Sequence, residues 1–314
     1  MSGLLVSMQG AVAQGILWGV LALGVYITFR LLNFADMTVD GSFALGGCVC
    51  AVMILNKGWN PVLALLLSMV AGALAGLVTG TLHTVFEIPS ILAGILTSIS
   101  LWSVNLHIMG GKSNIPLLQA ETIVSKLVGK AGFTQQQCSL IIGIIVVGAL
   151  TVLLYWFFGT ESGSALRATG NNEDMIRALG VSTKFMKVLG LMISNGLVGL
   201  SGGLVCQSQK VADIGMGTGA IVIGLAAIII GEVLLGRLRS FASKLISAVV
   251  GAVVYFMIRA IVLRLGMPPN YMKLLSAVMV GVALCVPVML DKYRTWKSYS
   301  EEGEVQDADN IECK

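Results

Sequence analysis

Charged side chains are scarce in this 314-residue chain, in which Asp, Glu, Lys and Arg together make up 11% of the residues. Soluble globular domains carry about 25% charged residues, so this chain has too few to cover a water-facing surface of its size. Apolar residues make up 56% of the chain, and the mean hydropathy is +0.89. These values exclude a cytosolic enzyme, a nucleic-acid-binding protein and a disordered protein as descriptions of the whole chain. They indicate an all-α polytopic membrane protein.

Several chemical motifs are missing as well. The chain has no P-loop of the form GxxxxGK[ST], so it contains no motif for binding ATP. It has no zinc motif, no plausible Ser/His/Asp set and no obvious relay of buried carboxylates. None of the six cysteines pairs with another at metal-ligand spacing, and we interpret them as small buried apolar side chains. We therefore expect no catalytic residue, no metal site and no cofactor bound by this chain.

Long stretches without charge divide the chain into membrane spans. A helix needs about 20 mostly apolar residues to cross the hydrocarbon core. The 38 glycines fit a membrane bundle, because small residues let helices pack closely. The pattern predicts about nine membrane-spanning or partly broken helices, at roughly 4–29, 41–56, 61–82, 88–110, 138–158, 188–207, 217–236, 241–263 and 272–290.

The distribution of Lys and Arg predicts the orientation of these spans. With the C-terminus in the cytoplasm, twelve of the twenty basic residues fall on the cytoplasmic side. Nine spans then place the N-terminus outside. We expect one transmembrane domain, 1–290, and a cytoplasmic tail, 291–314, whose acidic distal part is expected to be disordered.

A first polar segment, 33–42, joins two apolar runs. A helix there would put Asp36 and Asp40 on one face, where like charges repel. We therefore predict a non-helical turn in which Asp40 or Ser42 caps the next helix. The segment is either an ordinary cytoplasmic loop or a broken segment that lines a translocation path. The path in the second interpretation includes Asn33, Asp36, Thr38, Asp40 and Ser42, with Ser98 and Asn105 from a later span.

A second polar segment lies between the fifth and sixth spans. Asn171 or Asn172 can cap a short helix whose first turn carries two acidic residues, and Gly180 can end it. Such a helix can be a plain surface connector or can dock into a groove on a partner. Its predicted apolar face consists of Met175, Ile176, Ala178 and Leu179.

A third segment is rich in glycine. Gly217 and Gly219 delay the start of the following helix to about residue 219, so about 16–17 residues remain before Arg237. That length is marginal for crossing a core of ~30 Å at 1.5 Å per residue. We predict a short or broken helix with free N–H groups at its start. Glu232 is expected to pair with Arg237 or Arg239, or otherwise to contact a cytoplasmic partner.

These three segments, in this order, resemble the permease subunits of bacterial ABC importers. The branch they resemble holds the branched-chain amino acid and ribose permeases. Asn-Phe-Ala-Asp-Met-Thr-Val-Asp-Gly-Ser from residue 33 is similar to the segment after the family's first core helix. Arg-Ala-Thr-Gly-Asn-Asn-Glu-Asp from residue 167 is similar to the family's coupling helix, expected here within 164–182. The sequence of the first segment most resembles that of a subgroup linked to amino acids, including aromatic ones.

The resemblance also implies the other subunits of the importer. Two permeases, with a homodimer as our expectation, form the pathway in the bacterial inner membrane. An extracytoplasmic binding protein delivers the solute, and separate ATPase subunits bind ATP and magnesium. The expected ATPase-coupling residues are Arg167, Gly170, Asn172, Glu173, Asp174, Arg177 and Gly180. Gly217, Gly219 and Glu232 belong to the expected broken helix.

The sequence leaves other interpretations open. An ion-coupled secondary transporter would also use broken helices. An intramembrane enzyme would use Asp36 and Asp40 as a carboxylate pair, although both lie on one short segment rather than on facing helices. Within the importer interpretation, the solute is an amino acid or, alternatively, a sugar or nucleoside.

Overall fold

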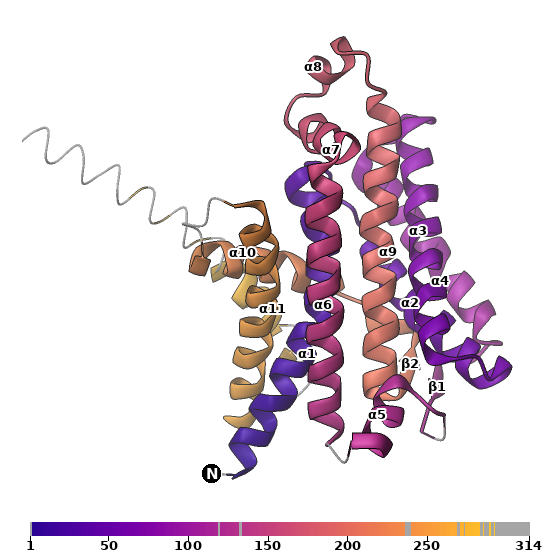
Figure 1. Cartoon of the computed structure of the whole chain (residues 1–314), viewed down its shortest axis with the longest axis vertical. Coiled ribbons are helices and arrows are strands. Elements are labelled where there is room, and N and C mark those ends of the chain that lie inside the picture. The colour runs from indigo at the N-terminus through magenta and orange to yellow at the C-terminus, as the bar shows by residue number, and fades with distance from the viewer. Residues whose placement is uncertain are drawn as a thin grey trace, which may run out of the picture.

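A computed structural model describes most of the chain, and in it the protein is a bundle of long helices with one small sheet (Figure 1). The predicted all-α polytopic fold is confirmed. The described residues are 2–118, 120–131, 134–235, 240–268, 271–272 and 274–282, with single positions at 285, 289 and 292. The tail 291–314, apart from position 292, and part of the ninth predicted span, 272–290, lie outside these residues.

Eight helical segments within the described residues are long and apolar enough to cross a membrane. The first is α1 (Ser2–Tyr26) with its π-helical continuation η1 (Ile27–Leu31), and the seventh is α10 (Ala220–Leu235) with the 3-10 turn η2 (Ile214–Gly217) before it. The others are α2 (Val39–Lys57), α3 (Pro61–Thr84), α4 (Ser90–Ile108), α6 (Gln135–Gly159), α9 (Thr183–Gln209) and α11 (Phe241–Arg264).

Short elements lie at the two ends of the bundle. The helices α7 (Glu161–Asn171) and α8 (Glu173–Ala178) form one end, which we call the α8 end (Figure 1). At the opposite end, β1 (Asn114–Pro116) pairs antiparallel with β2 (Val211–Asp213), next to α5 (Ile123–Ala131). The sheet therefore fixes the loop after α4 to the segment that follows α9.

Side-chain caps explain where several helices begin. The Asn60 side chain accepts a hydrogen bond from the Val62 N–H, and Pro61 occupies the first position of α3. Ser182 accepts from the Phe185 N–H in the same way. This cap starts α9 ahead of the charge-free run at 188, so that two lysines lie in its first turns.

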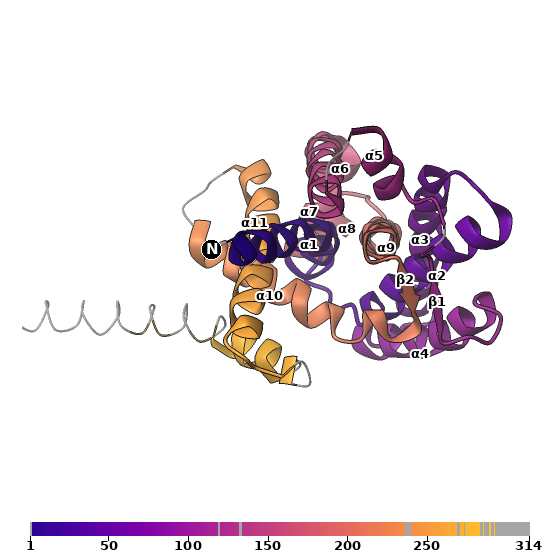
Figure 2. The same ribbon diagram turned by 90° about the horizontal axis from the view of Figure 1, so that it is seen from below.

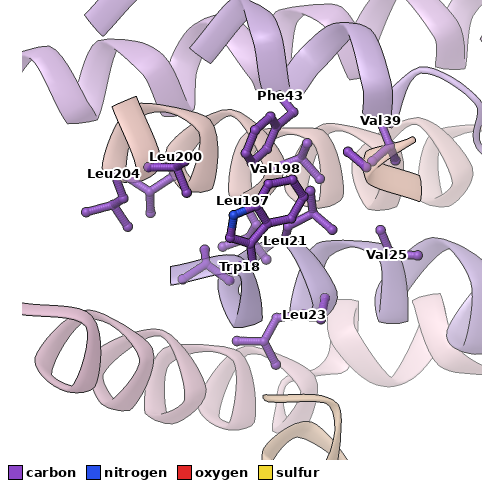
Figure 3. Close-up of a cluster of buried hydrophobic side chains, with 14 of the residues drawn as sticks. Trp18, Leu21, Leu23, Val25, Val39, Phe43, Leu197, Val198, Leu200 and Leu204 are labelled. Carbon is purple, nitrogen blue, oxygen red and sulfur yellow. The ribbon is translucent and has the colours of Figure 1, made fainter. Parts of the chain in front are cut away.

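The helices α1 and α9 form the centre of the bundle. Helices α2, α3 and α4 pack on one side of this pair, and α10 and α11 pack on the other (Figure 2). The core where α1, α2 and α9 meet includes Trp18 and Phe43, whose ring centroids are 4.6 Å apart (Figure 3). Both side chains are buried, and an aromatic pair of this kind contributes about 0.5–1.5 kcal/mol.

Glycine lets α3 approach α9 at backbone distance. A Cβ atom added to Gly76 would come within 2.2 Å of the carbonyl oxygen of Leu191, and one added to Gly72 within 2.2 Å of that of Asn195. No side chain fits at these positions. Such small-residue contacts replace the hydrophobic driving force that is absent between helices in lipid.

Candidate functional site

The first polar segment is a turn buried inside the bundle, between η1 and α2. Asp36 is 2% exposed, and Thr38 and Ser42 are fully buried. One Asp36 oxygen accepts from the Thr38 N–H at 2.9 Å, and the other accepts from the Asn195 Nδ2 at 2.6 Å. The Asn195 Oδ1 in turn accepts from the Ser42 hydroxyl at 2.7 Å, and Thr38 bonds to Thr79 at 2.7 Å. This network joins the turn to α2, α3 and α9.

The turn differs from the sequence prediction in its cap. Thr38, rather than Asp40 or Ser42, is the N-cap residue of α2, and both predicted caps lie inside the helix. At the start of the turn Asn33 is exposed and has a φ of 52°, in the left-handed region. The placement of these polar residues on a translocation path stays a prediction.

Asp40 caps a different helix. Its carboxylate oxygens accept from the Gly219 N–H at 3.0 Å and the Ile221 N–H at 2.9 Å, at the start of α10. The prediction of free N–H groups at this helix start is therefore wrong. A negative charge at a helix N-terminus is stabilised by the helix dipole. The first turn of α2 and the first turn of α10 are thus joined deep in the bundle.

The two glycines of the third motif permit this junction. A Cβ atom on Gly217 would lie 1.9 Å from the Asp40 carbonyl oxygen, so only glycine fits there. Gly219 has a φ of 83°, a backbone conformation that glycine adopts without strain. α10 then begins at Ala220, close to the predicted start, and its described part runs to Leu235.

Ser98 and Asn105, the two path candidates from a later span, both lie on α4. Ser98 is half-buried, and its backbone lies against Gly41 of α2. Asn105 is 1% exposed, and its Oδ1 atom has no hydrogen-bond partner among the described residues. A buried amide oxygen without a partner is costly.

Glu232 pairs with Arg30 of η1. The Arg30 Nε donates to a Glu232 oxygen at 2.7 Å, and the second oxygen accepts from Nη2 of the same guanidinium. Arg237 and Arg239, the partners expected from the sequence, lie outside the described residues. The pair joins the end of α10 to η1 at the α8 end.

The second motif folds into the predicted short capped helix, α8. Asn172 accepts from the Met175 N–H at 3.0 Å, and Gly180 follows the helix with a φ of 83°. Met175 is 51% exposed and Leu179 is 70% exposed. Ile176 is 4% exposed, so the expectation that it joins the exposed apolar face is wrong.

Glu173 fastens α8 to α9. Its carboxylate accepts from the Lys187 ammonium at 2.6 Å, from Arg177 at 3.1 Å and from the Thr183 hydroxyl at 3.1 Å. The hydrogen bond from Lys187, more than any other contact, holds the pKa of Glu173 below its usual range. The acidic residue that the sequence suggested as a partner contact is therefore engaged within the chain, whereas Asp174 is exposed.

Arg167 and Gly170 lie on α7 and are directed away from α8. The Arg167 guanidinium lies 5.1 Å from the ring centroid of Phe241. A Cβ atom on Gly170 would come within 1.7 Å of the Leu31 carbonyl oxygen. Gly170 was expected to shape an end of the coupling helix, but it instead permits α7 to pack directly on η1.

Two adjoining cavities lie away from the α8 end. The one nearer the end of the bundle has a volume of about 760 Å³, and the deeper one, which reaches the start of α10, about 960 Å³. Both are lined by Gln14, Gln209, Phe256 and Arg259, and the Arg259 guanidinium stacks 5.6 Å from the Phe256 ring centroid. A guanidinium beside aromatic walls can bind a carboxylate and an apolar body.

Sequence reasoning did not select the glutamines of these cavities, because single glutamines at helix ends carry no motif. Arg259 did give a signal, since it is a lone charge within an apolar span. The structure places it over an aromatic ring at the border of both cavities.

Replacement of Asp40 tests the junction between α2 and α10. We expect Asp40→Ala to lower the free energy of unfolding by about 1–2 kcal/mol, because two partly buried N–H groups lose their acceptor. Asp40→Asn keeps an accepting oxygen and should lose less. Thermal melting of the purified protein in detergent measures both, with the exposed Asp174→Ala as the control. An Asp40→Ala protein that melts like the wild type would contradict the capping role.

The ion pair between Glu173 and Lys187 predicts a pH dependence. Because the pKa of Glu173 is lowered on folding, its contribution to stability is present above the unfolded value of about 4.3 and is lost as the pH falls through the folded value. Glu173→Gln should therefore melt at a lower temperature than the wild type at pH 7, and the difference should shrink once the pH falls below about 4.3 and disappear below the folded pKa. Asp174→Asn, in the same turn, should show no such difference. A gap that persists at low pH would refute this assignment.

The chain matches known proteins along most of its length. Residues 7–284 match the family described as "Branched-chain amino acid transport system / permease component". The tyrosine transport system permease protein of Clostridioides difficile (strain R20291) is 38% identical over 280 residues, which cover 89% of this chain and 90% of that protein. An uncharacterized protein of Rickettsia prowazekii (strain Madrid E) is 32% identical over 277 residues, covering 87% and 95%.

A more distant relative is the autoinducer 2 import system permease protein LsrC of Salmonella paratyphi B, 26% identical over 255 residues that cover 79% of this chain and 68% of that protein. Its name, like that of the tyrosine permease, describes a transport permease and not an enzyme. The family match spans well over half of the chain, and it agrees with the eight apolar helices. The chain therefore belongs to the family of branched-chain amino acid transport system permease components, and it is a multi-pass, translocating ABC importer permease for a small solute.

Proposed function

We propose that this permease passes an amino acid, with aromatic and branched-chain amino acids as the first candidates, across a bacterial inner membrane. An extracytoplasmic binding protein delivers the solute, and ATP hydrolysis by a separate ATPase subunit drives the transport. The single observation that carries the proposal is α8, a capped helix between two spans that exposes apolar side chains at one end of the bundle.

Helix α8 has the properties of a coupling element. Met175 and Leu179 are exposed, and Asp174 and Arg177 flank them with charge. An apolar pair bordered by charges fits a groove on a partner protein. The ion pair between Glu173 of α8 and Lys187 of α9 connects the two helices, so a displacement of α8 by a partner would be transmitted to a central helix of the bundle. ATP and magnesium belong to the partner in this proposal, since this chain has no phosphate-binding motif.

The solute is proposed to enter at the opposite end of the bundle. The two cavities there place Arg259 beside Phe256, with Trp18 and Phe43 lining the deeper one. Arg259 is suited to receive the carboxylate of an amino acid, and the aromatic rings to pack against its side chain. The named solute of the Clostridioides difficile relative supports an aromatic amino acid. In this orientation α8 and the C-terminus are cytoplasmic.

A second copy of the chain is proposed to complete the pathway. Helix α4 presents a row of exposed apolar residues, including Ile95, Ile99 and Trp102, on the side away from α2. The same helix carries Ser98 and Asn105. A homodimer that pairs through α4 covers this apolar row, while Ser98, which lies against Gly41 of α2, and the buried Asn105 lie on the inward side of the helix.

Capture of an ATPase tests the coupling role. The chain is co-expressed with candidate ATPase subunits and purified by a tag on the permease. We expect the wild type to retain an ATPase and Met175→Asp/Leu179→Asp to lose at least about 90% of it. Two apolar side chains that become buried in a protein interface contribute about 2–4 kcal/mol to binding.

The matched control is Leu118→Asp/Leu265→Asp, which changes two exposed leucines in loops outside the helices. It should retain the ATPase as the wild type does. Loss of the ATPase from both double variants would indicate a general defect and contradict a specific role for α8. Failure of the wild type to retain any ATPase would favour an ion-coupled transporter.

A further inference from the structure

A positively charged cleft lies at the α8 end, apart from the two cavities described above. The end of α1, η1, α7, the end of α10 and the start of α11 enclose it, with a volume of about 570 Å³. Three cationic side chains line the cleft, from Arg30, Arg167 and Lys244, against one acidic side chain, from Glu232. The cleft therefore has an excess of positive charge.

The acidic residue neutralises only one of these cations. Glu232 is engaged by both nitrogens of the Arg30 fork. Among the described residues, Arg167 and Lys244 have no carboxylate within salt-bridge distance. Arg167 is instead held by stacking on Phe241. An oriented guanidinium and a flexible ammonium together provide donors for an anion, and a phosphate accepts from both.

An apolar groove of about 540 Å³ adjoins this cleft. The two share Arg167 and Phe241, so the groove begins where the cleft ends. Val152, Tyr155 and Trp156 of α6 line it, and Trp156 is 71% exposed. Tyr and Trp at the end of a spanning helix are typical of the membrane interface, where the lipid headgroups meet the acyl chains.

We propose that the cleft and the groove together bind one anionic phospholipid. The phosphate of its headgroup lies between Arg167 and Lys244, and an acyl chain follows the groove past Trp156. A free phosphate would need only the cleft, whereas the continuity with an apolar, membrane-facing groove is what a lipid requires. Basic pockets between spanning helices are a recurrent setting for anionic headgroups. The proposal needs only that the chain spans a membrane, and it does not depend on the solute or on the ATPase.

Fluorescence quenching tests this site directly. The purified chain in detergent is titrated with phosphatidylglycerol whose acyl chains are brominated, and tryptophan emission is recorded. We expect a saturable component of the quenching, above that of the exposed Trp59 and Trp102, which Trp156→Phe removes because bromine quenches at contact distance. Brominated phosphatidylcholine, which has no net charge, should need at least about tenfold higher concentration.

Charge variants separate the cleft from general attraction. Arg167→Gln/Lys244→Gln should raise the half-saturating phosphatidylglycerol concentration at least about tenfold. Arg177→Gln/Lys184→Gln removes the same charge at the same end but outside the cleft, and should leave it within about twofold. Lys244 is exposed, so Lys244→Gln alone will fold, and it should give an intermediate shift. Melting curves without lipid verify that each variant is folded.

Three results would overturn the proposal. Equal weakening by the two double variants would show that only overall charge matters. Equal binding of phosphatidylcholine would show that the groove takes lipid without the cleft. If millimolar inorganic phosphate abolished phosphatidylglycerol binding, and the wild type and Trp156→Phe were quenched equally, the cleft would be assigned to a free anion.

Discussion

The contact between the Asp40 carboxylate and the first N–H groups of α10 is the interaction on which the rest of the arrangement depends. Within the hydrocarbon region every backbone polar group must find a partner in the protein, because no water is available. The chain interrupts its helical backbone at 33–38, between the first two spans, and at 214–219, where the seventh span begins, and each interruption leaves such groups without helical partners. One acidic side chain at the start of α2 resolves the second interruption.

The first interruption is resolved by α9. Asn195 lies at the centre of α9. It donates a hydrogen bond to Asp36 of the turn and accepts one from Ser42 of α2. Glycine contacts hold α3 against the same helix, and Glu173 fastens α8 to its first turns. The polar network, the small-residue packing and the short helix α8 therefore all converge on α9. One continuous helix thus joins the α8 end to the buried turn.

Local patterns predicted the elements well, and long-range partners poorly. Runs without charge located eight helices, because the cost of burying a charge in lipid acts on each segment separately. The capping order around Asn172 and Gly180 likewise predicted α8, since a cap is a contact within four residues. Asp40 and Glu232 show where prediction from local patterns fails. Their partners are 179 and 202 residues away in the chain, and no local pattern distinguishes such a partner from a nearby residue.

The central claim is that this chain imports an amino acid only when an ATPase drives it. The most direct measurement is uptake of radiolabelled tyrosine by proteoliposomes that contain the co-purified permease and ATPase, with the binding protein added outside. The account predicts uptake that requires ATP inside, does not respond to an ion gradient, and falls at least about tenfold in Arg259→Gln but not in Arg264→Gln, since a buried charged contact contributes about 1.5–3 kcal/mol. Uptake by the permease alone, driven by an ion gradient without ATP, would contradict it.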